Sequence, residues 1–154
     1  MIRILRAFLV ASAVILACAA GEASIREQQA VLLKNLETLF IKRDLGSFQN
    51  PGGKKVSILI VHSLIEPPKG IEQARFRSFK QIEQWLRSHE RFHDESINEH
   101  HPFREVRKGQ FSGPDRYEYD NMGINHNTWY LSQVDFTQTN GRVTISKIVI
   151  YDGD

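Results

Sequence analysis

Hydrophobic residues follow three kinds of spacing along this chain. Residues 7–16 are apolar except for Ser12. Between residues 24 and 44, apolar side chains recur every three or four positions, which is the spacing of an amphipathic helix. After residue 103, short segments rich in β-branched and aromatic residues predict strands. This order predicts an α+β fold, with N-terminal helices packed on a curved, mainly antiparallel, cone-like sheet.

The first predicted helix spans Ser24–Asp44. Ser24 and Glu27 have the spacing of a capping box, in which the hydroxyl and the carboxylate each bond a first-turn amide. Gly46 follows at a position that suits a helix end. The apolar stripe that would face the core consists of Ile25, Leu32, Leu33, Leu36, Leu39 and Phe40.

A strand and a second helix are predicted next. Residues 56–65 are β-branched and apolar and lie between turn residues, as expected for a well-buried strand. Ser78 begins the second helix, and Gln81 completes a second capping box. One side of this helix carries Ile82, Trp85, Leu86, His89 and Phe92, and the polar residues 94–101 form a loop after it.

Four further strands are predicted, over residues 103–111, 117–122, 128–137 and 142–151. Asn140-Gly141 joins the last two, and this pair predicts a tight hairpin because both residues tolerate positive φ. Strict alternation in the last strand would place Val143, Ile145, Lys147, Val149 and Tyr151 on one face. Its later part is apolar on both faces, as in a sheet that is covered on both sides.

The N-terminus has the order of a secretory signal peptide. Arg3 and Arg6 precede the apolar run of residues 7–16, and small residues follow it at 17–21. The apolar run is shorter than the ~20 residues that a membrane-spanning helix needs. We therefore expect residues 1–23 to be a signal peptide, residues 24–154 to be a single domain, and the mature protein to be secreted and extracellular.

Cys18, the only cysteine, lies within this N-terminal segment. It is either removed with the signal peptide or, if Ile15-Leu16-Ala17-Cys18 acts as a bacterial lipobox, it carries a lipid. Leu16, two residues before the cysteine, is bulky for a lipobox, so removal is favoured. The mature chain then has no disulfide and no cysteine ligand for zinc, and it contacts a membrane only if Cys18 is lipidated.

Three features resemble the nuclear transport factor 2-like superfamily, including its SnoaL-like branch. The first helix runs into Asp44-Leu45, and a short helix at residues 79–88 follows the first strand. Trp129-Tyr130-Leu131 and Val134-Asp135-Phe136 then precede the Asn140-Gly141 turn of a closing hairpin. These are core and turn residues rather than catalytic motifs.

The resemblance implies a cone-shaped cavity between the sheet and the helices. Members of this superfamily include ketosteroid isomerases and scytalone dehydratases, which place an aspartate or histidine base in the cone, and many members without known activity. His62 and Asp135 are polar residues inside predicted strands and are candidates to line such a cone. A small apolar ligand and a homodimer are partners that the resemblance would allow.

His89-Glu90-Arg91-Phe92-His93 matches the HExxH pattern of zinc peptidases, in which two histidines bind Zn²⁺ and the glutamate is the general base. The match falls on the second predicted helix, with Glu99, His100 and His101 nearby. Arg91 places a charge at a normally uncharged position, and no glycine follows to turn the chain toward a third ligand. We therefore expect no metal and no cofactor, and a zinc hydrolase remains an alternative.

The net charge and the absence of certain motifs reduce the number of possible function classes. The net charge is +2, below the clustered basic excess of nucleic-acid-binding proteins, so we expect no nucleic-acid partner. No phosphate-binding loop or nucleophile elbow is present. The sequence predicts a secreted module that binds a small ligand or a partner without catalysis, and it identifies no catalytic residue. A cone-fold isomerase or dehydratase that uses His62 or an aspartate base is the further alternative.

Overall fold

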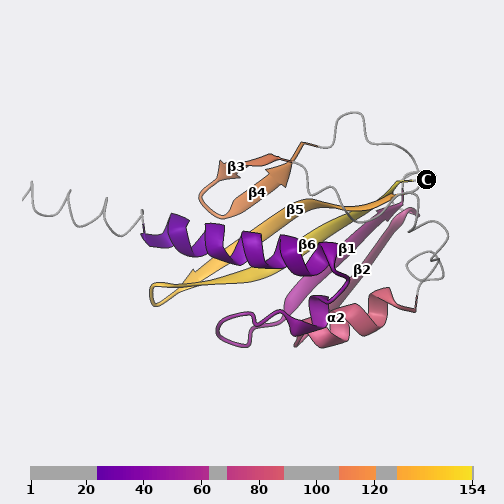
Figure 1. Ribbon diagram of the computed structural model, residues 1–154, viewed down its shortest axis with the longest axis horizontal. Helices are drawn as coiled ribbons and strands as arrows, with labels where there is room; N and C mark the ends of the chain where they lie inside the picture. Colours follow the sequence, from indigo (N-terminus) through magenta and orange to yellow (C-terminus); the bar gives the residue numbers. More distant parts are fainter. Residues whose placement is uncertain (1–23, 63–68, 89–107, 121–127, 154) are drawn as a thin grey trace, which may run out of the picture.

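The fold is built on a six-stranded mixed sheet with two helices packed on its curved face (Figure 1). The computed structural model describes residues 24–62, 69–88, 108–120 and 128–153. The strands are β1 (Val56–His62), β2 (Ile71–Phe76), β3 (Gly109–Gly113), β4 (Arg116–Tyr119), β5 (Thr128–Thr139) and β6 (Arg142–Gly153). Their order across the sheet is β2-β1-β6-β5-β4-β3. The predicted α+β fold, with N-terminal helices on a curved sheet, is confirmed.

The N-terminal helix covers residues 24–41 and ends three residues before the predicted end at Asp44. Arg43 adopts a left-handed conformation, with φ of 55°. The amide of Asp44 donates to the carbonyl of Leu39 at 2.9 Å, and the amide of Arg43 donates to the carbonyl of Phe40 at 3.0 Å. These two bonds form a Schellman motif, so Arg43 ends the helix.

Gly46 therefore has a different role from the predicted helix end. It lies in the 3₁₀ helix η1 (Leu45–Ser47), which packs against α2 (Phe79–Leu86). The Gly46 amide donates to Oε2 of Glu83 at 2.5 Å. A Cβ at this position would lie 2.7 Å from the same oxygen. The missing side chain of Gly46 therefore lets η1 approach α2 closely.

The predicted start of α2 at Ser78 is confirmed. The Ser78 hydroxyl accepts a hydrogen bond from the amide of Gln81. The Gln81 side chain accepts from the amide of Arg77, one residue before the cap, so the capping box is displaced by one position. The predicted apolar positions His89 and Phe92 lie outside the described residues.

Neighbouring strands of the sheet are antiparallel except for β1 and β6, which run parallel. The predicted hairpin between β5 and β6 is confirmed, with φ of 52° at Asn140 and 73° at Gly141. The sequence did not predict β2. This edge strand has an exposed residue at four of its six positions, so it lacks the apolar pattern of a buried strand.

A bulge at Ser146 changes the faces predicted for β6. Phe136 pairs with Ile145, whereas the preceding Asp135 pairs with Lys147, so β6 contains one extra residue at this point. Ile145 and Ile148 consequently both face the helices, and Lys147 faces the opposite side. The alternation predicted for Ile145 and Lys147 is therefore wrong. We call the helix-covered side of the sheet the inner face and the opposite side the outer face.

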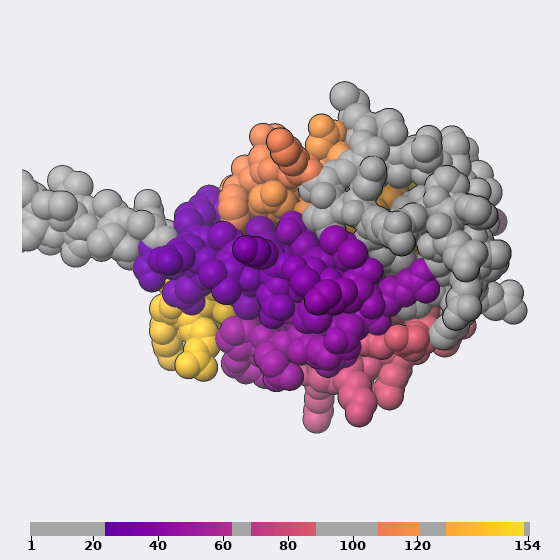
Figure 2. Space-filling model, in the orientation of Figure 1, coloured from indigo at the N-terminus to yellow at the C-terminus, as the bar shows by residue number. Residues whose placement is uncertain are grey.

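The hydrophobic core lies between the inner face and the two helices. Figure 1 shows the N-terminal helix lying across the sheet, and in Figure 2 the residues of this helix form much of the face toward the viewer. Leu36, Ile82 and Leu86 from the helices are fully buried, as are Ile58 and Ile60 from β1. Within the described ranges, no helix is both long and apolar enough to cross a membrane.

Candidate functional site

His62 is the last residue of β1 and lies on the inner face. Ile58 and Ile60 precede it at alternate positions, and both are completely buried. The parallel pairing of β1 with β6 places His62 opposite Asp152. His62, a candidate cone-lining residue, lies on the helix side of the sheet, and the carboxylate of Asp152 lies beside it.

His62 contacts a carboxylate through each ring nitrogen. Nδ1 lies 2.8 Å from Oδ2 of Asp152, and Nε2 lies 2.8 Å from Oε1 of Glu72. Carboxylates only accept hydrogen bonds when ionised, and a neutral imidazole can donate from one nitrogen only. The imidazolium form of His62 therefore satisfies both contacts at once. We call His62, Asp152 and Glu72 the histidine cluster.

The two carboxylates of the histidine cluster differ in burial. The Asp152 side chain is 4% exposed, whereas the Glu72 side chain, on edge strand β2, is 45% exposed. Asp152 therefore fixes the imidazole from behind, in the way that a buried carboxylate orients a histidine for binding or proton transfer. Glu72 lies on the accessible side, where water or a ligand can compete with it.

One sequence signal could have identified Asp152. Ile148 and Ile150 are buried at alternate positions of β6, and Asp152 is the next residue in the same register. A carboxylate that continues a buried apolar register is unusual, because an ionised group inside a protein needs a partner. The identity of that partner depends on the β1–β6 pairing, which the sequence did not reveal.

A further acid, Glu37, lies on the helix side of the sheet, away from the histidine cluster. Tyr119 of β4 is buried, and its hydroxyl donates to Oε1 of Glu37 in the N-terminal helix at 3.0 Å. Burial raises the pKa of Glu37, and the hydrogen bond from Tyr119 lowers it by a smaller amount. Burial also raises the pKa of Tyr119, as do the charge of Glu37 and the hydrogen bond to it, so the phenol remains a donor.

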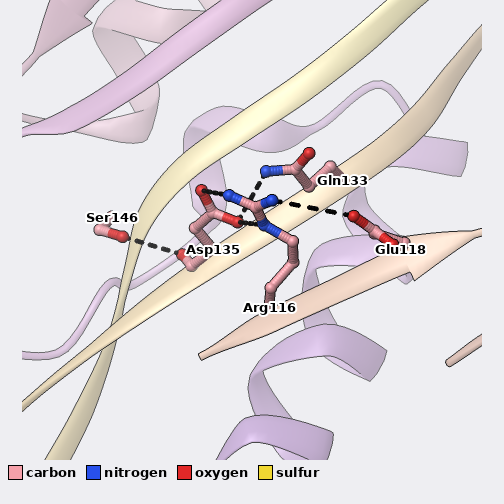
Figure 3. A network of polar contacts seen from close by, with 5 residues as sticks. All are labelled: Arg116, Glu118, Gln133, Asp135 and Ser146. Carbon is pink, nitrogen blue, oxygen red and sulfur yellow. Dashed lines mark hydrogen bonds and ion pairs between the residues drawn. The ribbon is translucent and has the colours of Figure 1, made fainter. Parts of the chain in front are cut away.

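Asp135, the other predicted cone-lining candidate, lies on the outer face (Figure 3). Its carboxylate accepts hydrogen bonds from Arg116 Nε at 2.9 Å and from Gln133 Nε2 at 2.7 Å. The hydrogen bond to Asp135 is the main cause of the raised pKa of Arg116. Glu118 lies 3.9 Å from the same guanidinium. Asp135 therefore belongs to an exposed ion-pair network, and the structure does not bring it together with His62.

The HExxH motif at His89–His93 and the nearby Glu99, His100 and His101 lie outside the described residues. Among the residues that the structure does describe, no group of three or more His, Cys, Asp or Glu side chains could hold a metal ion. The chain matches no protein-family model, no curated protein and no solved structure.

Proposed function

We propose that this chain is a secreted domain of the nuclear transport factor 2-like type that binds a small ligand at the histidine cluster. The observation that carries the binding proposal is the contact of His62 with buried Asp152 on one side and accessible Glu72 on the other. An imidazole fixed on its buried side offers one directed polar group at the end of β1, next to the buried apolar residues Ile58 and Ile60. Sites of this composition, mostly apolar with a few oriented polar groups, are typical of small-ligand binding.

The family and the secretion are supported by independent features. The N-terminal helix precedes the sheet, α2 follows the β1–β2 pair, and β6 pairs with both β1 and β5. This agrees with the sequence features from which the family resemblance was inferred. Secretion is supported by the charge, apolar run and small residues of the first 23 positions.

The contacts of His62 favour a ligand that carries a carboxylate. Glu72 places a carboxylate oxygen 2.8 Å from Nε2, so this position already accommodates that group. Glu72 is nearly half exposed, and an exposed ion pair contributes at most ~1 kcal/mol. A carboxylate on a ligand with apolar atoms can replace Glu72, since it adds apolar burial to the same polar contact.

Titration of the whole chain with benzoate and with benzamide tests this function. The two probes have the same shape, but only benzoate carries the charge. We expect benzoate to bind at least about fivefold more tightly than benzamide and to shift the ring resonances of His62 in NMR spectra. His62→Gln keeps a donor for Asp152 but removes the ring, so it should abolish the preference for benzoate. Equal affinity for the two probes would contradict the proposal.

Acid–base catalysis is a second candidate function, and the His62–Asp152 contact favours it. A histidine held by a buried carboxylate can act as a general base, which typically accelerates proton transfer by ~10²–10⁴-fold. The measurement is exchange of the α-hydrogens of cyclohexanone for deuterium in D₂O. Exchange that is faster with the native chain than with His62→Gln would support catalysis, and equal rates would leave binding as the function.

A further inference from the structure

A row of aromatic side chains crosses β3 and β4 on the inner face. Phe111 and Tyr117 make an edge-to-face contact with ring centroids 5.0 Å apart, and Tyr117 and Tyr119 make a second contact with the same separation. We call these three residues the aromatic row. The faces of these rings are electron-rich and attract cations, whereas the ring edges carry partial positive charge.

The N-terminal helix places one charged residue at each end of the aromatic row. The Arg26 guanidinium lies over the Phe111 ring, 4.0 Å from its centroid. Glu37, about three helical turns further on, accepts the hydrogen bond from Tyr119. The Phe111 end is therefore occupied by a cation of the protein itself, whereas the Tyr119 end carries a carboxylate.

Glu37 lacks a cationic partner in the part of the chain that the structure describes. No lysine, arginine or histidine there forms an ion pair with it, and its described hydrogen bond comes from a neutral phenol. Half-burying a carboxylate without a counter-charge costs free energy, because water solvates the charged form better than the protein does. A ligand cation at this position would offset that cost.

We propose that Glu37 and the Tyr117–Tyr119 end of the aromatic row bind an organic ammonium group. The carboxylate supplies the counter-charge, and the tyrosine rings supply cation–π contacts, which contribute ~0.5–2 kcal/mol. Tyr119 holds Glu37 in place through its hydroxyl and serves as a positioning residue as well as a contact. This site is separate from the histidine cluster, since β4 and β1 are three strand positions apart, or ~14 Å.

The charged residues near the ends of β3 and β4 do not supply a counter-charge for Glu37 in the described part of the chain. Tyr119 also borders a hollow of about 410 Å³ at the ends of β3 and β4, whose wall includes Lys108, Glu118 and Asp120. Glu118 belongs to the outer-face ion pairs of Arg116, and Lys108 makes no ion pair with Glu37. The proposal therefore depends on Glu37 and the tyrosines alone.

Choline and 3,3-dimethyl-1-butanol form the matched probe pair, because they have the same shape and differ in charge. We expect choline to bind the whole chain saturably, with a dissociation constant of a few millimolar or below, in calorimetry or NMR titration. The uncharged alcohol should bind at least about tenfold more weakly. Choline should also shift the ring resonances of Tyr117 and Tyr119.

Variants locate the site. Glu37→Gln keeps an acceptor for Tyr119 but removes the charge, so it should weaken choline binding about tenfold. Glu27→Gln is the control, since Glu27 is an exposed residue of the same helix and the same charge is lost. Tyr119→Phe keeps the ring and should weaken binding less than Glu37→Gln.

Three results would overturn this proposal. The first is that choline does not bind the native chain saturably. The second is that choline and the uncharged alcohol bind with equal affinity. The third is that Glu37→Gln and Glu27→Gln lose choline affinity equally. Benzoate binding to the same variants separates the two proposals, because Glu37→Gln should leave the histidine cluster unchanged. Thermal unfolding of each variant shows whether it is folded.

Discussion

The two ends of the sheet use polar side chains in different ways. At the end with the β3–β4 and β5–β6 turns, amide side chains bond to backbone groups. Gln28 accepts from the amide of Val143 and donates to the carbonyl of Gly141, both at 3.1 Å. Gln29 donates to the carbonyl of Pro114 at 2.7 Å. At the opposite end, the contacts of His62 join side chains to side chains.

We propose that this difference separates the polar contacts that stabilise the fold from those that bind a ligand. Uncharged amides that satisfy backbone groups stabilise the fold, because an unsatisfied buried backbone group costs ~1–3 kcal/mol. The imidazole of His62 lies between two carboxylates, and its described side-chain contacts satisfy no backbone group. We therefore expect substitutions at the turn end to change stability and substitutions at the histidine cluster to change binding.

Asn50→Ala should have the largest effect on stability. The Asn50 amide accepts from the amide of Ile145 at 2.9 Å and donates to its carbonyl at 2.8 Å. Because Ile145 is completely buried, its backbone groups would lose both partners, at a cost of ~2–4 kcal/mol. Urea unfolding measures the loss, and Asn35→Ala on the exposed helix surface is the control, with no loss expected. Equal losses of stability at the two positions would contradict the structural role that we assign to the Asn50 side chain.

The interaction between His62 and Asp152 should change the free energy of unfolding by less than Asn50→Ala does and by more than Glu37→Gln does. A double-mutant cycle with His62→Gln and Asp152→Asn should give an interaction energy of ~1–3 kcal/mol, because the carboxylate is buried. The corresponding cycle with Glu72→Gln should give less than ~1 kcal/mol, since Glu72 is largely solvated. Urea unfolding of the single and double variants provides both values. A larger coupling to Glu72 would reverse the assignment of the buried and accessible partners.

Glu37→Gln should have the smallest effect on the free energy of unfolding, and this effect should depend on pH. Burial raises the pKa of Glu37 above the ordinary value of 4.5, so the protonated form favours the folded state. That contribution is complete below pH 4.5 and is lost as the pH rises through the raised value. Glutamine stays neutral, so the variant should gain stability relative to the native chain between pH 4 and pH 7, by a few tenths of a kcal/mol after solvent screening. Thermal unfolding at both pH values measures this gain, and a relative loss would contradict the direction.

Local sequence signals predicted the parts of the fold that depend on neighbouring residues. Ser78 marks the start of α2, and Asn140-Gly141 marks the hairpin, because each sets the backbone conformation at its own position. The strand β2 and the bulge at Ser146 were not predicted, since both depend on pairing with distant strands.

The candidate site was only half predicted for the same reason. The sequence analysis selected His62 as a polar residue within an apolar strand, but Asp152 lies 90 residues away and meets it only through the parallel β1–β6 register. Asp135 was a candidate on the same grounds as His62. Its pairing with Arg116 and its place on the outer face follow from the β4–β5 register, which no local pattern contains.

The affinity of Glu72→Gln for benzoate tests the central claim most directly. Glu118→Gln is the matched control, because Glu118 is exposed to a similar extent on the outer face, at 47% against 45% for Glu72. If Glu72 occupies the position of a ligand carboxylate, its removal should tighten benzoate binding by about fivefold or more, and the control should stay at the native value. Unchanged or weaker binding in Glu72→Gln, or equal changes in both variants, would contradict ligand binding at the histidine cluster.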